Sequence, residues 1–454
     1  MDGDAGTGRR CEVRGGGIRT SLRVFVGCLC FAALGVGCAN VGAPEREGPS
    51  GTLKVFDGDE ARFRAEIQPY LSASFPNLQV ELLPFEAFVQ QRRNGGAAET
   101  DALYNEFMER YNPDVIVARD ASSFRTLLEN QWLMPLDRVM EESEYIPDPI
   151  DPRLLEALEA EDGLQYALAP TFSSRAIFYN RERFEQAGAP FPTDGMTWEE
   201  VLRLATLLAS PEADADGAIR YGLYHESSDR PYGVIVDVAA RSGGHYVDDA
   251  GEAMTIRTPA WREAWTAVTE AYRAGAIYRA SPDEAANDPF ALFADGSIAM
   301  MTGNESTAVR LAATDALWGM ATEPVDPRRP EIGASLHFTL YASVNQRSER
   351  PEAAWNVVRW LGLENAARDG TGIPVEREAY KRKFGDLDLG ALYRLEPDRE
   401  VAAQGAAVPS SDFYFEMFVE GSRWSESVIA GEAAVEQALE ALEAVGGPFL
   451  LRRD

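Results

Sequence analysis

Strand patterns and helix patterns alternate along this chain from residue 52 onward, and this alternation limits the folds that it can adopt. Residues 52–56 form a short apolar strand pattern, and the next segment carries apolar residues on one helical stripe. Residues 78–82 then alternate apolar with polar side chains, as a second strand does. Because strands separated by helices usually pair in parallel beneath those helices, we predict an α/β fold with mixed, mainly parallel sheets and helices on both faces.

The most regular part of the pattern is residues 166–205. An apolar strand pattern ends at Asn180, which can cap a helix that stops at Gly188. Thr197 and Glu200 then have the T-x-x-E spacing of a capping box, ahead of apolar residues at helical spacing. This stretch therefore predicts a strand, a helix, a proline-rich loop and a second helix.

Length and charge narrow the class of protein. At 454 residues the chain is long enough for two or three domains, each with its own core. Its formal net charge is −30, which repels nucleic acid and anionic lipid. We therefore expect no nucleic-acid partner.

The beginning of the chain has the pattern of an export signal. Two arginines flank an apolar stretch at residues 22–36 that is too short for a membrane-spanning helix of about 20 apolar residues. Small residues precede Cys38, as in the lipobox of bacterial lipoproteins; cleavage at Cys28 or at an ordinary signal-peptidase site is the alternative. All four cysteines lie in the first 38 residues, so a chain that begins at a lipidated cysteine there has no disulfide and no thiol nucleophile. We predict a signal peptide at 1–37 and a lipidated tether at 38–51.

The sequence contains no motif for catalysis or for a resident metal. The three histidines, His225, His245 and His337, lack the H-x-x-x-H and H-E-x-x-H spacings of zinc sites. No phosphate-binding G-x-x-x-x-G-K-[ST] loop and no G-x-S-x-G nucleophile motif occurs. Asp59 lies in an acidic D-G-D-E run, but arginines occupy the later ligand positions of a calcium loop. We therefore predict no enzyme activity and no cofactor.

Four ordered blocks of sequence resemble a known family. The stretch 166–205 reads Y-A-L-A-P, then hydrophobic-Y-N, R-x-x-F-x-x-A-G and T-W-E-E. Before it come P-D-V and L-x-x-x-x-W-L-x-P-L-D, within residues 113–137. After it come F-A-D-G-S-I-A-M-M-T-G at 293–303 and S-x-R-P-E-A-A-W at 348–355. Together these blocks resemble the bacterial extracellular solute-binding proteins of family 1, which are mostly sugar-binding receptors of ABC importers.

The resemblance implies a type II periplasmic-binding-protein-like fold, with two α/β lobes and a ligand cleft between them. Carried onto this chain, the crossings between lobes fall near residues 168–171, 283–288 and 324–330. The implied boundaries are 52–168 and 288–326 for the first lobe, and 172–285 and 331–454 for the second. The resemblance also favours lipidation at Cys38, a monomer anchored on the periplasmic or extracellular side of the cell envelope, and ABC permease subunits as partners.

Candidate ligand contacts lie at strand ends and near the implied crossings, because open α/β sheets bind ligands there. Sugars are bound by aromatic faces and by polar side chains that hydrogen-bond their hydroxyl groups. The residues that meet these conditions are Asp59, Asp120, Phe172, Arg175, Tyr232, Asn304, Glu305, His337, Phe413 and Tyr414. For each aromatic residue the alternative is core packing, and for each carboxylate it is a helix cap or a surface charge.

These features together predict the substrate-binding component of an ABC importer, with a carbohydrate or polyol as ligand. The resemblance implies hinge closure around that ligand and delivery to a membrane permease, without catalysis. Two alternatives stay open. One is a secreted carbohydrate-active enzyme, which needs two carboxylates in one cleft, and the other is a sensor lipoprotein on the same fold.

Overall fold

Two four-stranded sheets organise the chain, and the first is built mainly from its N-terminal part. In the computed structural model the order of this sheet is β11-β3-β1-β2. Strand β1 (Gly51–Asp57) pairs in parallel with β2 (Leu78–Leu82) and β3 (Val115–Ala118), whereas β11 (Tyr341–Val344) is antiparallel to β3. We call this sheet and the helices packed on it the first lobe.

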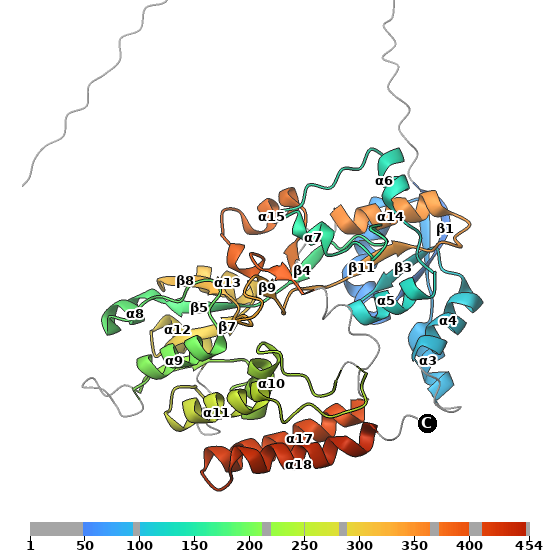
Figure 1. Ribbon diagram of the computed structural model, residues 1–454. Coiled ribbons are helices and arrows are strands. Elements are labelled where there is room, and N and C mark those ends of the chain that lie inside the picture. The colour runs from blue at the N-terminus through green and yellow to red at the C-terminus, as the bar shows by residue number, and fades with distance from the viewer. Residues whose placement is uncertain are drawn as a thin grey trace, which may run out of the picture. The chain divides into compact units, whose positions relative to one another are not determined.

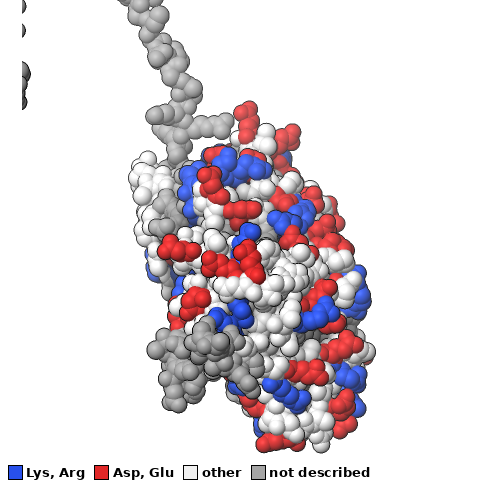
Figure 2. Space-filling view, turned by 90° about the vertical axis from the view of Figure 1, so that its left-hand side faces the viewer, with Lys and Arg blue, Asp and Glu red and all other residues white. Residues whose placement is uncertain are grey.

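The structure describes residues 49–93, 100–210, 219–248, 250–280, 288–363, 372–398 and 411–450. The predicted signal peptide, Cys38 and nearly all of the predicted tether lie outside these residues. Within them, no helix combines the length and the apolar character that crossing a bilayer requires. On the face drawn in Figure 2, acidic side chains are interspersed with basic ones.

Helices cover both faces of the first sheet (Figure 1). Leu53 and Val55 of β1 belong to a buried cluster that includes Trp355 of α14. Phe56, one position further, points to the opposite face and packs against Phe107 of α4 with ring centroids 5.6 Å apart. The helices of this lobe are α1 (Glu60–Arg62), the π-helical η1 (Phe63–Ile67), α2 (Gln68–Ser74), α3 (Phe85–Arg93), α4 (Thr100–Tyr111), α5 (Ala121–Glu129), α6 (Asp137–Glu142) and α14 (Pro351–Leu363), whereas α7 (Arg153–Glu156) contacts β13 (Glu396–Pro397).

The second sheet has the order β6-β7-β5-β8. Strand β5 (Ala176–Asn180) is antiparallel to both β7 (Ile298–Gly303) and β8 (Trp318–Thr322), and β6 (Tyr221–Tyr224) is parallel to β7. With its helices this sheet forms the second lobe. Figure 1 shows α17 and α18 side by side, packed against α10 and α11. The helices of this lobe are α8 (Arg181–Ala187), α9 (Trp198–Leu208), α10 (Pro231–Ala240), α11 (Pro259–Arg273), α12 (Pro289–Ala294), α13 (Glu305–Ala312), α17 (Ser411–Ile429) and α18 (Val435–Leu450).

The predicted strand, helix and second helix of residues 166–205 are confirmed by β5, α8 and α9. Asn180 accepts the N–H of Arg183 at the start of α8, and Gly188 ends that helix with a φ of 63°. The Thr197 hydroxyl accepts the Glu200 N–H while the Glu200 carboxylate accepts the Thr197 N–H. Both bonds of the capping box therefore form.

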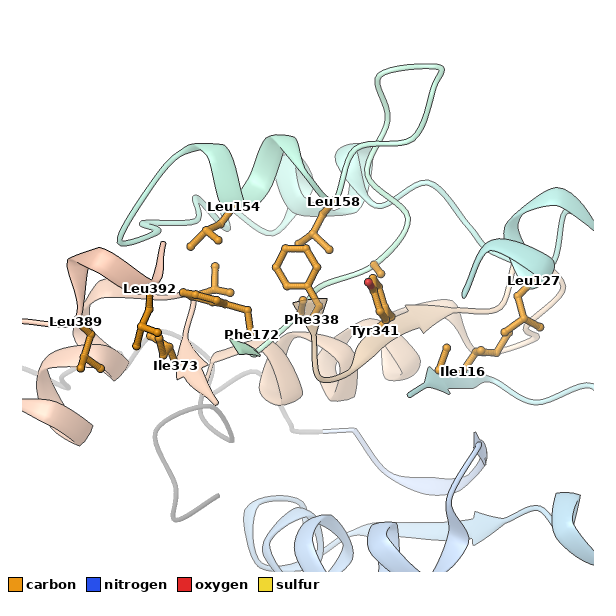
Figure 3. Packing of buried hydrophobic residues seen from close by; sticks show 14 of the residues in the cluster. Ile116, Leu127, Leu154, Leu158, Phe172, Phe338, Tyr341, Ile373, Leu389 and Leu392 are labelled. Carbon is orange, nitrogen blue, oxygen red and sulfur yellow. The ribbon is translucent and has the colours of Figure 1, made fainter. Parts of the chain in front are cut away.

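A small antiparallel sheet lies where the chain passes between the lobes. Its central strand β4 (Thr171–Ser173) pairs with β10 (His337–Phe338) and β12 (Ile373–Pro374). Phe172 of β4 is fully buried, among Leu154 and Leu392 in Figure 3. The remaining elements near this sheet are β9 (Ile332–Gly333), α15 (Arg377–Phe384), η4 (Gly390–Leu392) and β13 (Glu396–Pro397).

The membership of the lobes differs from the predicted boundaries. Assigning 288–326 to the first lobe is wrong, because β7 and β8 pair with β5 of the second sheet. Assigning all of 331–454 to the second lobe is wrong for β11 and α14, which lie on the first sheet. The predicted crossing at 283–288 falls mostly outside the described residues, but β6 and β7 on either side of it are neighbours in one sheet, so the chain is in the same lobe before and after it. Hydrophobic periodicity identifies a strand but not its partner, so the pattern could not place these segments.

Candidate ligand-binding site

A cavity of about 810 Å³ lies at the edge of the second sheet where β6, β7 and β8 end. Its walls come from the β4–β5 junction, the C-terminal end of α10, the start of α13 and the loop 324–337. Because β5 is antiparallel to its two neighbours, its first residues meet their last residues at this edge. Ligands of α/β sheets bind beyond the carboxyl ends of the strands, so this cavity is the candidate site.

Asp237 lies at the centre of the charged groups in the cavity wall. Its Oδ1 is 3.3 Å from Arg175 Nη1 and 3.4 Å from Arg241 Nη2, and its Oδ2 is 3.4 Å from His225 Nε2. Burial raises the pKa of this carboxyl, but Arg241, His225 and Arg175 outweigh burial and leave the pKa below its usual value. Asp237 is therefore ionised at neutral pH and holds two guanidinium groups in place. Arg175 also contacts the Glu226 carboxylate.

Glu323 extends this network to the loop that leaves the second sheet. Its buried carboxylate contacts Arg241 and accepts the Ser335 N–H at 2.9 Å. Burial raises the pKa of Glu323, against the lowering effect of Arg241 and Ser335. The Ser335 hydroxyl in turn accepts the backbone N–H of Arg175 at 2.9 Å. Arg175, Asp237, Arg241, Glu323 and Ser335 thus form a closed ring of contacts in the cavity wall.

The other charges of the lining are paired as well. Asp326 contacts Arg328 at 2.6 Å, and Asp398 contacts Arg329 at 2.9 Å. Among the described lining residues, every arginine and every carboxylate has an opposite charge within ion-pair distance. The described residues contain no group of three His, Cys, Asp or Glu side chains arranged as metal ligands. The cavity therefore presents compensated charges and neutral polar groups.

The cavity lining also contains neutral hydrogen-bonding groups, which are suited to binding the hydroxyl groups of a ligand. Asn304 Oδ1 accepts the N–H groups of Ser306 and Thr307 at 3.0 and 3.4 Å, which caps α13. Its Nδ2 bonds no described residue and can donate to a ligand. His337 Nδ1 lies 3.0 Å from the Ser335 carbonyl oxygen and therefore donates to it, so His337 Nε2 is left as an acceptor. A donor and an acceptor on one cavity wall match a polyhydroxylated ligand.

Two aromatic side chains, Tyr224 and Phe290, also line the cavity. Phe290 lies beneath the Arg310 guanidinium, whose Cζ is 3.4 Å from the ring centroid, so one face of this ring is covered. Burial raises the pKa of Tyr224, and the charges of Asp229 and Glu226 raise it further. Tyr224 therefore stays a neutral hydroxyl donor across the physiological pH range.

The sequence matches the family model described as "Bacterial extracellular solute-binding protein" over residues 99–372, which is more than half of the chain. The chain belongs to this family. Its members bind solutes outside the cytoplasm.

Comparisons with individual proteins agree on the fold. A binding protein of Brucella abortus (strain 2308) is 23% identical over 366 residues, which cover 77% of this chain and 82% of that protein. The sugar-binding protein MalE of Xanthomonas citri superposes with a TM-score of 0.57 at 17% identity, over 89% of this chain and 98% of that one. A solute-binding protein of an ABC transporter from Agrobacterium vitis, solved with bound D-mannitol, gives 0.55 at 17% identity, over 88% and 98%. The predicted two-lobed periplasmic-binding-protein fold is thereby confirmed.

The structure of this solute-binding protein brings three of the predicted site residues together. Arg175, Asn304 and His337 all line the cavity. Glu305 lies next to them but is buried: its carboxylate accepts the Ser173 hydroxyl at 2.8 Å and the Gly372 N–H at 2.9 Å. Glu305 therefore supports the cavity wall from behind.

The other predicted contacts lie elsewhere. Phe172, Tyr232 and Phe413 have no exposed surface and pack in hydrophobic clusters, so their prediction as ligand contacts is corrected to core packing. A short apolar pattern beside a polar loop has the same appearance in a core strand and in a cleft wall, which explains the error. Tyr414 is 41% exposed on α17, outside the cavity lining, with its ring against Phe413.

Two predicted carboxylates cap helices in the first lobe. Asp59 accepts the Arg62 N–H at the start of α1, and Asp120 accepts the Ser123 N–H at the start of α5. Neither lines the cavity. The local sequence could not separate the two roles, since helix caps and ligand contacts both follow strand ends.

The sequence interpretation missed Asp237, Arg241 and Glu323. One signal was present: Asp237 of α10 and Arg241, the C-cap residue of that helix, are an acid and a base four residues apart, and the other residues of α10 are almost all apolar. A charged side chain on an otherwise buried helix needs an opposite charge or a hydrogen-bond partner. Several such groups at one end of a helix indicate a polar cavity there. Glu323 had no such signal, because it follows β8 in an irregular loop.

Proposed function

We propose that this protein is the substrate-binding component of an ABC importer and that it binds a neutral carbohydrate or polyol in the cavity of the second lobe. The observation that carries the proposal is the combination of fully paired charges with spare neutral donors and acceptors along one wall. Hydroxyl groups of a ligand can form hydrogen bonds with these donors and acceptors, whereas a charged ligand would find no unpaired opposite charge in the cavity. The A. vitis neighbour was solved with D-mannitol, a ligand of the proposed class.

Closure of the two lobes around the ligand is the proposed mechanism. The cavity adjoins Ser173 of β4 and His337 of β10, so its wall is continuous with the small sheet at the crossings. In the first lobe, the carboxyl ends of β1 and β3 carry Asp57 and Arg119, whose side chains pair at 2.8 Å. We expect closure to bring this edge over the bound ligand and so shift the open–closed equilibrium.

In the proposed setting the protein is a monomer, lipid-anchored through Cys38 on the outer face of a cell membrane. Its closed form would dock on ABC permease subunits, which supply the energy for uptake. Deleting the gene should abolish uptake of the ligand. Unchanged uptake together with a lost transcriptional or behavioural response would favour a sensor instead.

A thermal-shift screen of the mature protein tests the ligand class directly. D-mannitol, ribitol and maltose serve as neutral probes, and any true ligand should raise the melting temperature in a concentration-dependent way. Mass spectrometry of the recovered ligand should show it unaltered; cleavage would favour a carbohydrate-active enzyme. A wider panel of neutral sugars and polyols that gives no stabilisation would overturn the assignment.

A further inference from the structure

Among the ion pairs of the described cavity lining, Arg175–Glu226 is the pair in which both side chains reach solvent, whereas Arg329 is 41% exposed but its partner Asp398 is buried. Arg175 is 36% exposed and Glu226 50% exposed at their side chains. Arg175 is fixed from behind by Asp237 at 3.3 Å, and its backbone N–H bonds Ser335 at 2.9 Å. Glu226 lies in the turn between β6 and α10; Arg175 is the cation that contacts it, and its charge acts on Arg241 from further away.

An exposed arginine in a polar cavity is the natural partner of a ligand carboxylate. In this protein a carboxylate of the chain already occupies that position. An acidic ligand would have to displace Glu226 from Arg175 and would then lie close to both Glu226 and Asp237, two like charges. A neutral polyol meets no such repulsion, because its hydroxyl groups can donate hydrogen bonds to these carboxylates and accept them from Arg175.

We propose that Glu226 determines ligand specificity, by acting as a built-in counter-ion that keeps sugar acids away from Arg175. This inference rests on the proposed function, because it concerns the same cavity. The inference adds how the protein discriminates between a polyol and the corresponding sugar acid. The protein repels the acid, although a cationic partner for the acid, Arg175, is present. Removing the charge of Glu226 should therefore create affinity for acids that the natural protein rejects.

The test compares mature wild-type protein with Glu226→Gln. Its probes are two matched pairs, D-glucitol with D-gluconate and D-glucose with D-glucuronate, measured by calorimetry and thermal shift. We expect Glu226→Gln to bind at least one of the two acids at least about tenfold more tightly than wild type at low salt. Raising the salt to about 0.5 M should weaken this binding. Affinity for the neutral partners should change much less.

Glu426→Gln is a matched control. Glu426 pairs with Arg279 at 2.7 Å, with side-chain exposures of 50% and 38%, but lies on α17 outside the cavity lining. This control should gain no affinity for the acids. Because Glu226 is half-exposed in a turn, we expect Glu226→Gln to keep the wild-type circular dichroism spectrum. The double variant Arg175→Gln/Glu226→Gln should lose the gained acid binding.

The outcomes separate this inference from the proposed function. Acid binding that is no tighter in Glu226→Gln than in wild type or Glu426→Gln overturns the role of Glu226, whatever the neutral probes do. Tight acid binding by wild type also overturns it, while leaving solute binding intact. Failure of every neutral ligand, with acid binding gained in Glu226→Gln, would instead overturn the neutral ligand class and support the counter-ion role.

Discussion

Glu305 Oε2 accepts a hydrogen bond from the Ser173 hydroxyl at 2.8 Å, across two segments that are 132 positions apart in the chain. The same carboxylate accepts the Gly372 N–H through Oε1 at 2.9 Å. One buried side chain at the start of α13 therefore joins the cavity wall, the small sheet at the crossings and the segment that enters β12. Gly372 itself has a φ of 101°, which residues other than glycine rarely adopt, and this conformation directs its N–H toward Glu305.

Replacing Glu305 with alanine should destabilise the protein by about 1–3 kcal/mol, because a buried hydroxyl and a buried N–H lose their acceptor. Glu305→Gln keeps one acceptor oxygen and should cost less. Urea denaturation of the two variants and wild type gives the three free energies of unfolding. An alanine variant as stable as wild type would show that Glu305 does not join these segments.

The capped elements could be predicted from sequence because their determinants are local. Thr197 and Glu200 lie three positions apart, and their two hydrogen bonds form within one turn of helix. The lobes could not be predicted in the same way, since β11 pairs with β3 across more than 200 residues. A strand pattern carries no information about so distant a partner.

The site shows the same division between local and distant information. Arg175 and Asn304 could be predicted because each lies beside an identifiable strand end. The role of Asp237 depends on the C-terminal end of α10 meeting the ends of β5, β7 and β8, which only the assembled sheet reveals. For the same reason the buried Phe172 could not be separated from a cleft aromatic by its neighbours in sequence.

Asp237→Asn should be among the most destabilising substitutions in the second lobe. It removes the charge that the buried Arg241 and the half-buried Arg175 share; because Glu323 and Glu226 remain beside them, the cost should approach but not exceed the about 3–5 kcal/mol of a broken buried ion pair. Glu142→Gln, which breaks an exposed pair with Arg138, should cost less than about 1 kcal/mol. Denaturant unfolding at pH 7 compares the two. If the two substitutions lower the free energy of unfolding by equally small amounts, the ion pairs around Asp237 do not hold this part of the fold in place.

The stability of wild type relative to Asp237→Asn should also depend on pH. The folded-state pKa of Asp237 is below its unfolded value, so its ionised form adds stability above about pH 4. That contribution is lost as the pH falls toward the folded-state pKa. The difference in unfolding free energy between the two proteins should therefore narrow as the pH falls from about 5 toward 3. A difference that widens on acidification would contradict the assignment.

Gly222→Ala should destabilise the second lobe, and Gly58→Ala should change stability much less. A Cβ on Gly222 of β6 would lie 1.9 Å from the carbonyl oxygen of Ala205, so α9 could not keep its distance from the sheet. Overpacking of this kind costs about 1–3 kcal/mol or more, because backbone has to move. A Cβ on Gly58 would have Arg119 Cγ at 3.7 Å as its nearest neighbour, an ordinary van der Waals contact, so alanine there should cost less than about 0.5 kcal/mol. Thermal melts of both variants and wild type measure the difference, and equal melting temperatures would contradict the close packing of α9 on β6.

Asn304→Asp separates the two roles of Asn304. Aspartate keeps the oxygen that caps α13 and adds a negative charge at a helix N-terminus, so stability should hold or rise slightly. It loses the Nδ2 donor that we assign to the ligand, and affinity for the neutral ligand should fall about tenfold, the equivalent of one hydrogen bond to a polar group. Asn304→Ala should lose both the helix cap and the Nδ2 donor, and the loss of the cap should lower the free energy of unfolding by about 1 kcal/mol. Calorimetric titration with the ligand from the screen, paired with thermal melts, measures the two effects independently. Unchanged affinity in the aspartate variant would remove Asn304 from the binding site and leave it as a cap alone.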